Sequence, residues 1–373
     1  MFNRNKKVFK QFDWLLFLST LALCVFGLFV LRSATASPQY GSSYFKSQLM
    51  ATVIGFAAIL FLLIVDTDFL KRLALPIYLV CIGLLVLTLV IGFGEDSWGA
   101  RSWMKLGPLT FQPSEFSKIG MILAIGALLD RYSNELNRPV TLLKIGGVML
   151  IPLALIARQP DFGTMMVFAF FFALMLFYAG LHWGYIGGAI GIVGLSLPII
   201  YSHLDTYQKN RILNFLDPSR DPLGSTYQST QGTIAIGSGQ LLGRGYMQGP
   251  QTMYGFIPEQ QTDYIFAVLA EEFGFIGGVV LICTYTLMLF RMLSIAKRAK
   301  DVFGATVSIG IAAMIFVHIF ENIGMTIGLM PVTGIPLPFM SSGGTFQLIN
   351  LISVGLVLSI GAQRRPLDFN AAD

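Results

Sequence analysis

The chain has 373 residues, of which 54% are hydrophobic and only 12% carry a charged side chain. A soluble globular protein has about twice that charged fraction, and a disordered protein has few aromatic residues, whereas this chain contains 31 phenylalanines. The mean hydropathy of +0.69 therefore favours an integral membrane protein. The net charge of +5 does not indicate nucleic-acid binding, because the Lys and Arg residues are spread over many short loops.

Apolar segments long enough to cross the hydrocarbon core occur ten times along the chain. Because a spanning segment has to satisfy its own backbone hydrogen bonds, we predict an all-α, polytopic helical bundle formed by a single domain over residues 1–373. The first apolar segment is longer than the core of a signal peptide, so we expect an uncleaved span. The predicted spans are residues 14–33, 46–65, 73–94, 113–130, 143–158, 163–181, 184–201, 264–290, 303–329 and 342–362.

An even number of spans places both termini on one side of the membrane, and the distribution of Lys and Arg indicates which side. If the N-terminus is cytoplasmic, most basic residues of the short loops are cytoplasmic as well. We therefore predict two cytoplasmic termini and one long extracytoplasmic loop, residues 202–263, which we expect to fold onto the outer end of the bundle. The basic residues on the predicted inner side are Arg4, Lys6, Lys7, Lys10, Lys71, Arg72, Arg131, Arg138, Lys144, Arg291, Lys297, Arg298, Lys300, Arg364 and Arg365.

The start of the fourth predicted span carries an ion-pair motif. Glu115 and Lys118 are three residues apart, so they share a helix face and can pair. Charged residues inside a membrane are costly, so we interpret this pair as a structural element that positions a site. Arg101 and Lys105, just upstream, form a small basic loop suited to a phosphate group.

Two aspartates lie at the outer ends of predicted spans. Asp161 falls in a tight turn before the sixth span, where capping of that helix is the favoured interpretation. Asp263 precedes the eighth span and could also be an N-cap. A stripe of small residues continues its helix face and would admit another helix or a lipid chain; it consists of Ala267, Ala270 and Gly274. Glu271 or Glu272 could pair with a cation on another span, such as Lys118.

Two further groups attract attention in the last two predicted spans. His318 and Glu321 share a helix face, and a structural pair is favoured over a proton relay because no chain of such residues crosses the bundle. The connection over residues 331–339 contains three prolines and should be stiff. The N–H groups of Ser341, Ser342 and Gly343 could bind an anion at the start of the last span, or simply begin that helix. The three cysteines and three histidines show no metal-ligand spacing.

Five segments resemble the SEDS family (shape, elongation, division and sporulation), namely residues 99–118, 158–164, 211–223, 258–274 and 322–344. Their order and spacing match over the whole chain, and the sequence GMTIGLMPVTG, residues 324–334, favours the elongation type. The resemblance implies a peptidoglycan glycosyltransferase of the bacterial cytoplasmic membrane that polymerises lipid II for cell-wall elongation. It also implies a class B penicillin-binding protein and other elongation-complex proteins as partners.

The resemblance also assigns roles to individual residues. The family's essential carboxylate matches Asp263, and its buried pair matches Glu115 and Lys118. Family motifs further match Arg101, Asp161 and the turn of residues 341–344, in which Ser342 stands where the family usually has Tyr. Glu321 has no family role that carries over.

We therefore hypothesise that Asp263 is a general base that removes the proton of the acceptor sugar 4-hydroxyl as it attacks C1 of the donor. The leaving pyrophosphate would be stabilised by Arg101, Lys105 or Arg211, in that order of expectation, or by Mg²⁺ or Mn²⁺, for which no ligand signature is present. We expect Asp161 and residues 341–343 to line the substrate site. A lipid flippase or a non-catalytic scaffold remains an alternative, although the clustering of informative residues at the outer end favours chemistry.

Overall fold

A computed structural model describes residues 11–36, 43–94, 101–106, 109–203, 206–217, 220–221 and 226–363. The basic residues predicted at the two termini lie outside this part of the chain: Arg4, Lys6, Lys7, Lys10, Arg364 and Arg365. Residues 218–219 and 222–223 of the family-like segment 211–223, and residues 99–100 and 107–108 of segment 99–118, also lie outside it.

Each of the ten predicted spans coincides with a long helix. Seven helices of the described residues are long and apolar enough to cross a membrane, namely α2, α3, α4, α7, α13, α14 and α15. Helix α8 and the apolar part of α9 are shorter, and α6 carries the Glu115–Lys118 pair near its start and Asp130 and Arg131 at its end. The ten helices are α2 (Trp14–Ala34), α3 (Ser43–Leu62), α4 (Thr67–Ile91), α6 (Pro113–Arg131), α7 (Pro139–Ala157), α8 (Phe162–Tyr178), α9 (Trp183–His203), α13 (Ile265–Lys297), α14 (Val302–Thr326) and α15 (Gly344–Ala362).

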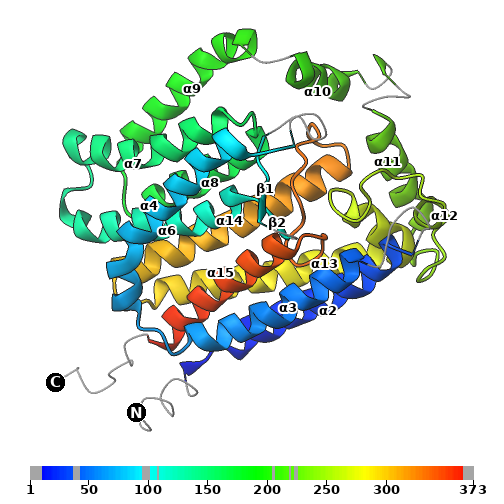
Figure 1. The fold of residues 1–373 in the computed structure, drawn as a ribbon, viewed down its shortest axis with the longest axis horizontal. Coiled ribbons are helices and arrows are strands. Elements are labelled where there is room, and N and C mark those ends of the chain that lie inside the picture. Colours follow the sequence, from blue (N-terminus) through cyan, green and yellow to red (C-terminus); the bar gives the residue numbers. More distant parts are fainter. Residues whose placement is uncertain are drawn as a thin grey trace.

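Nine of these helices pack into one bundle in which α14 and α15 are buried along most of their length, whereas α9 lies at its edge with almost all of its described residues exposed (Figure 1). Glycines allow close approach at several crossings. A Cβ on Gly310 of α14 would lie 2.7 Å from the Met175 sulfur of α8, and one on Gly355 of α15 would lie 3.2 Å from Cα of Ile59 on α3. The all-α, polytopic fold predicted from the sequence is therefore confirmed.

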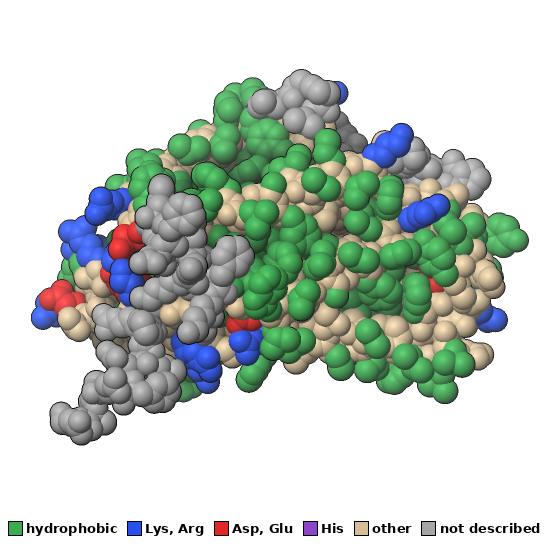
Figure 2. All heavy atoms as spheres, turned by 90° about the horizontal axis from the view of Figure 1, so that it is seen from below, with side chains coloured by type: hydrophobic (Ala, Val, Ile, Leu, Met, Phe, Trp, Pro, Cys, Tyr) green, Lys and Arg blue, Asp and Glu red, His purple; other side chains and the backbone are tan. Residues whose placement is uncertain are grey.

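Charged residues gather at the ends of the bundle, and apolar side chains cover its middle (Figure 2). At one end, Arg291 of α13 donates to Asp13 (2.6 Å), which also caps α2. Lys71 pairs with Asp130 at the same end. An apolar belt between polar ends is the surface expected of a membrane-spanning bundle.

The long segment before α13 contains three further helices: α10 (Thr206–Leu216), α11 (Tyr227–Gly239) and the short α12 (Pro250–Met253). Helix α11 packs directly on the start of α13. A Cβ on Gly232 would lie 2.6 Å from the ring of Tyr264, and one on Gly239 would lie 1.9 Å from the carbonyl oxygen of Ala270. Helices α11 and α12 thus pack on the end of the bundle where α13 begins, as predicted for this loop, whereas α10 lies farther out (Figure 1).

Helix α13 is interrupted at Gly274, where φ is +64° and ψ is −162°. The interruption frees backbone groups, and the loop after α11 satisfies them. The N–H of Phe275 donates to the carbonyl of Gln240 (2.8 Å), and the N–H of Arg244 donates to the carbonyl of Glu271 (2.9 Å). The small-residue stripe of α13 therefore contacts the chain's own α11 and its loop along this side.

The segment between α4 and α6 contains a β-hairpin where the sequence suggested only a loop. Strands β1 (Met104–Leu106) and β2 (Leu109–Phe111) are antiparallel, with Lys105 opposite Thr110. An isolated bridge between Phe93 and Trp103 continues the pairing toward α4. Period-2 alternation over three residues is too short to distinguish from a loop, so the hairpin could not be predicted from the pattern of residues.

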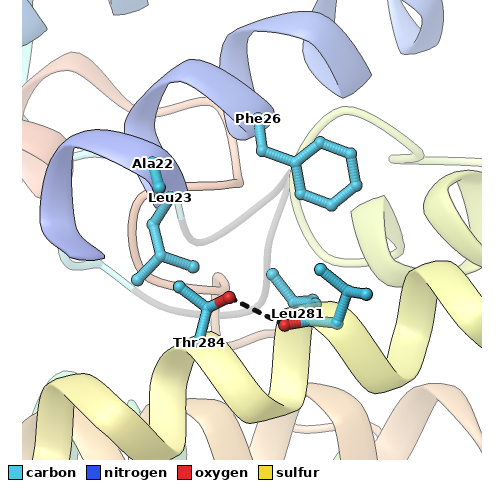
Figure 3. A pocket seen from close by; sticks show the side chains of 6 residues that line it. Ala22, Leu23, Phe26, Leu281 and Thr284 are labelled. Carbon is cyan, nitrogen blue, oxygen red and sulfur yellow. Dashed lines mark hydrogen bonds between the residues drawn. The ribbon is translucent and has the colours of Figure 1, made fainter. Parts of the chain in front are cut away.

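Two cavities of the described structure lie away from Asp263, which lines neither of them. The smaller, about 140 Å³, lies between α2 and α13 and is lined mainly by apolar side chains (Figure 3). Its one hydroxyl, on Thr284, donates to the carbonyl of Val280 at 2.8 Å. The larger is an open cavity beside Asn137, His182 and Tyr185, in the loops after α6 and α8.

Candidate active site

A tight turn over residues 259–263 places Asp263 just before α13. The carbonyl of Glu259 accepts the N–H groups of Thr262 (3.1 Å), Asp263 (3.1 Å) and Tyr264 (3.3 Å). The Thr262 hydroxyl also donates to the Glu259 carboxylate (3.1 Å). Glu259 itself has a φ of +51°, a left-handed conformation that costs a non-glycine residue about 1–2 kcal/mol. The turn therefore needs support from its surroundings.

That support comes from α14 and from the segment before α15. The side-chain amide of Asn322, fully buried on α14, donates to the carbonyls of both Asp263 and Ile335, each at 2.8 Å. The Ser341 hydroxyl donates to the carbonyl of Thr262 (2.5 Å), and the N–H of Ser342 donates to the carbonyl of Gln261 (2.8 Å). The turn and the proline-rich connection are thus fixed to each other.

Helices α2 and α3 complete the frame around the turn. Gln260 donates to the carbonyl of Ala34 at the end of α2 (2.8 Å). Gln48 of α3 donates to the carbonyl of Ser341 (3.0 Å) and accepts from the N–H of Gly343 (3.1 Å). Residues far apart in the sequence therefore hold one short backbone segment in place.

The Asp263 carboxylate does not cap α13, contrary to one interpretation of the sequence. The N-cap of α13 is Tyr264, and it makes no side-chain capping bond. The side chain of Asp263 is partly exposed. Gly334 is the residue beside it: a Cβ there would lie 3.6 Å from Oδ2. The residue is held through its backbone, and no capping bond engages its carboxylate.

The pKa of the Asp263 carboxyl is raised to about 7. The main cause is burial, which disfavours the charged form, and the charge of Glu259 adds to the rise. Arg211 of α10 opposes the rise by favouring the carboxylate. A carboxyl group with a pKa near neutrality is suited to take a proton and release it again at physiological pH.

The predicted Glu115–Lys118 pair is confirmed, with Nζ 2.8 Å from Oε1 and both side chains buried. Lys118 also lies 2.9 Å from Nε2 of His318 and 5.5 Å from the ring centre of Phe346. His318 therefore contacts Lys118, and the pairing of His318 with Glu321 considered from the sequence is wrong. The cation of Lys118 joins α6 to α14 and faces α15.

The suggested pairing of Glu271 or Glu272 with Lys118 is also wrong. Glu271 accepts the N–H of Gln251 (2.9 Å) and both the N–H (3.0 Å) and the hydroxyl (2.7 Å) of Thr252. Glu272 accepts from the N–H of Met247 (3.1 Å) and from the hydroxyl of Ser33. Both carboxylates therefore bind the loop that contains α12. Sequence spacing could not reveal this, because that loop returns from a distance to cover them.

Asp161 is the N-cap of α8, as favoured from the sequence. Its carboxylate accepts the N–H (3.1 Å) and the hydroxyl (2.9 Å) of Thr164. It also accepts from the side-chain amide of Gln112 (3.1 Å), the residue before α6. Asp161 thereby ties the starts of two helices together, and a contact with substrate stays a prediction.

The three basic candidates differ in their relation to Asp263. Arg211 is the cation whose charge acts on the Asp263 carboxyl, although it was ranked last from the sequence. Arg101 and Lys105 are exposed, Lys105 on β1 and Arg101 with its side chain passing near Gly92. Their predicted contact with a pyrophosphate stays a prediction.

The turn of residues 341–343 does not offer free N–H groups to an anion. The N–H of Ser341 donates to the carbonyl of Leu337 (3.0 Å), while those of Ser342 and Gly343 donate to Gln261 and Gln48. These three N–H groups are thus engaged within the protein, and a contact of the turn with substrate stays a prediction. The turn positions the backbone that carries Asp263.

Asn322, Gln48 and Glu259 were missed by the sequence reasoning. Asn322 and Gln48 are uncharged polar residues inside apolar spans, and the rule applied to charged residues there could have found them. Glu259 could not be found in this way, because its role depends on a turn whose shape is set by distant segments.

Mg²⁺ or Mn²⁺ has no evident protein-built site here. Among the described residues, no group of three or more His, Cys, Asp or Glu side chains could hold a metal ion. Glu259 is the carboxylate whose charge acts on Asp263, and its own oxygen is bonded to Gln261 and Thr262. A requirement for Mg²⁺ or Mn²⁺ stays a prediction, and no step below depends on one.

Comparison with known proteins places this arrangement in a family. The family model described as "Cell cycle protein", which covers FtsW, RodA and SpoVE, matches residues 13–366. The chain therefore belongs to the FtsW/RodA/SpoVE family, the SEDS family. Within that family it is 37% identical over 372 residues to peptidoglycan glycosyltransferase MrdB of Escherichia coli strain K12, with 98% of each chain covered.

Two solved structures share the fold. One is a chain of a peptidoglycan synthase complex studied for its coordination of polymerization and crosslinking. It has a TM-score of 0.80 and 32% identity, and the match covers 95% of this chain and 98% of that one. The other is the rod shape determining protein RodA of Thermus thermophilus. It has a TM-score of 0.72 and 28% identity, and the match covers 95% of this chain and 98% of that one.

Proposed function

We propose that this protein is a peptidoglycan glycosyltransferase that polymerises lipid II for cell-wall elongation, with Asp263 as its general base. One observation supports the role of Asp263 most directly. Its carboxylate does not cap α13, and the residue is partly exposed. Its backbone is held by Asn322, which binds its carbonyl, and by Ser341, which binds the carbonyl of Thr262. The relatives named as peptidoglycan glycosyltransferases supply the reaction class.

In the proposed reaction, the 4-hydroxyl oxygen of the acceptor sugar attacks C1 of the donor sugar. The bond from C1 to the pyrophosphate oxygen breaks, its electron pair leaves with the lipid-linked pyrophosphate, and C1 is inverted. The hydroxyl proton moves to a carboxylate oxygen of Asp263. A base with a pKa of about 7 gives this proton to water before the next cycle.

The charges near Asp263 suit such a substrate. Arg211 of α10 carries the cation that acts on the Asp263 carboxyl, and Arg101 and Lys105 are exposed in the connection between α4 and α6. Lys and Arg side chains bind phosphate groups. These three side chains are proposed to bind the leaving pyrophosphate, and Arg211 is now the first candidate. The undecaprenyl chain would lie along the apolar surface of the bundle.

The partner is proposed to be a class B penicillin-binding protein, together with other elongation-complex proteins. Its support is the structural relative from a complex that coordinates polymerization and crosslinking. We further propose that both termini are cytoplasmic, which places Asp263 on the outer side, where lipid II is used. The basic residues at the end of the bundle opposite Asp263, such as Arg291 and Lys300, support this orientation.

The direct test is polymerisation of labelled lipid II by the purified chain, with and without its transpeptidase partner. Asp263→Asn keeps the shape of the side chain but removes the base, so the rate should fall by about 10²–10⁴-fold. The control is Asp68→Asn, which removes an exposed carboxylate that pairs with Lys300 at the far end of the bundle. Asp263→Asn polymerising at the wild-type rate would exclude the general base. Transfer of lipid II across vesicles without new glycosidic bonds would instead support a flippase.

A further inference from the structure

Glu321 is a carboxylic side chain buried inside the bundle without a partner. It lies on α14 with 1% of its surface exposed, and neither carboxylate oxygen has a hydrogen-bond partner among the described residues. It is five residues from the end of α14 at Thr326, which places it about 7.5 Å below that helix end. An ionised carboxylate in such a place costs several kcal/mol unless a cation compensates it.

Lys118 is the cation that acts on Glu321, but its charge is already balanced. Its ammonium group donates to Glu115 at 2.8 Å and lies 2.9 Å from Nε2 of His318. Nδ1 of His318 is 2.7 Å from the carbonyl of Met314, an acceptor that requires a proton on Nδ1. Nε2 is then the acceptor for Lys118, and the imidazole is neutral. One positive charge thus faces the one negative charge of Glu115.

The other helices around the Glu321–Lys118 cluster contribute a negative charge and an aromatic ring. Asp161, at the start of α8, adds a negative charge. Helix α15 brings the ring of Phe346 beside Lys118. On α13, Glu271 and Glu272 are bound by the loop that contains α12. A second ionised carboxylate in this cluster would therefore lack compensation.

We propose that Glu321 is a proton-binding site, which the folded protein holds as a neutral carboxylic acid. Loss of this proton would create a carboxylate that competes with Glu115 for Lys118, the cation joining α6 to α14. The next residue, Asn322, holds the carbonyl of Asp263 at 2.8 Å. Ionisation of Glu321 would therefore loosen the support of the Asp263 turn as the pH rises. Only this last link rests on the proposed function.

The test is thermal unfolding of the full chain in detergent micelles between pH 6 and pH 9, for wild type and Glu321→Gln. An unfolded chain releases a proton that the folded chain holds, so the stability of wild type should fall as the pH rises. Gln resembles the neutral acid, so Glu321→Gln should fold, keep its Tm near the wild-type value at pH 6 and lose less Tm at pH 9. Glu135→Gln is the matched control, because Glu135 is exposed and should leave the wild-type slope unchanged.

Infrared spectroscopy gives a second measurement that needs no activity. Wild type at pH 7 should show the C=O stretching band of a protonated carboxyl group that Glu321→Gln lacks. Equal pH slopes for the two proteins, or the absence of a difference band, would overturn the proposal. A rise in wild-type Tm with NaCl or MgCl₂ at pH 8 that Glu321→Gln lacks would also overturn it, because the site would then hold a metal cation. None of these outcomes depends on whether the chain polymerises lipid II.

Discussion

The pH dependence of polymerisation follows from the environment of Asp263. As a general base it has to be ionised, so the rate should rise with pH through its pKa. At a pKa of about 7, about 9% of these carboxyls are ionised at pH 6 and about 91% at pH 8, so the rate should increase about tenfold. The sign is opposite to that of a general acid, which would lose activity over the same range.

Glu259→Gln tests the physical cause of this pKa. The charge of Glu259 raises the pKa of Asp263, so its removal should lower that pKa and move the rise in rate to lower pH. The amide oxygen of Gln can still accept the hydroxyl of Thr262, which keeps the turn closed. Arg211→Gln should move the curve the other way, because Arg211 favours the carboxylate.

The assay is the initial rate with labelled lipid II well below saturation, because kcat/KM reports the ionisation of the free enzyme. The measurement is repeated in the Glu321→Gln variant, so that ionisation of Glu321 at high pH cannot lower the activity. Glu135→Gln should not shift the curve. A rate that is constant between pH 6 and pH 8, or a shift of Glu259→Gln to higher pH, would refute the reasoning.

Three further substitutions have expected outcomes. Asn322→Leu leaves the carbonyls of Asp263 and Ile335 without a donor, which costs about 1–3 kcal/mol of stability for each and should lower the Tm. The rate of polymerisation should also fall, by about 100-fold if Asp263 moves by about 1 Å. Gly239→Ala puts a methyl group on a carbonyl oxygen of α13, at 1.9 Å before relaxation, and should lower Tm in a thermal scan. Asp161→Ala removes the cap of α8 and should cost about 1 kcal/mol of stability, and wild-type activity in that variant would exclude a substrate contact.

The positions of the helices could be predicted from the sequence because a membrane leaves few options for the backbone. Every apolar run of sufficient length became a helix, and Pro113 at the start of α6 and Asp161 before α8 marked helix starts correctly. The same local rules found the Glu115–Lys118 pair, since three residues of spacing set the contact within one helix.

Contacts between segments could not be predicted in this way. Most partners of Glu271 and Glu272 come from a loop about 20 residues upstream and one, Ser33, from α2, while Asn322 binds the backbone carbonyls of Asp263 and Ile335. A hydrogen-bond donor in a span predicts that some acceptor is near, but it does not say which. The support of the Asp263 turn is made of such contacts, so the sequence could identify the carboxylate and not the frame that holds it.

Three aspartates at helix starts differ from Asp263 in what their side chains bind. Asp13, Asp161 and Asp301 each accept an N–H of the helix that follows, which is the bond that makes aspartate common at these positions. Asp263 stands at a similar place in the sequence, yet the turn of Glu259 moves the start of α13 past it. The turn thus contains a residue in the left-handed conformation and is held by several buried hydrogen bonds, and it leaves the Asp263 carboxylate without a capping bond. A purely structural aspartate would need none of this, and that difference is the physical reason to assign the chemistry to Asp263.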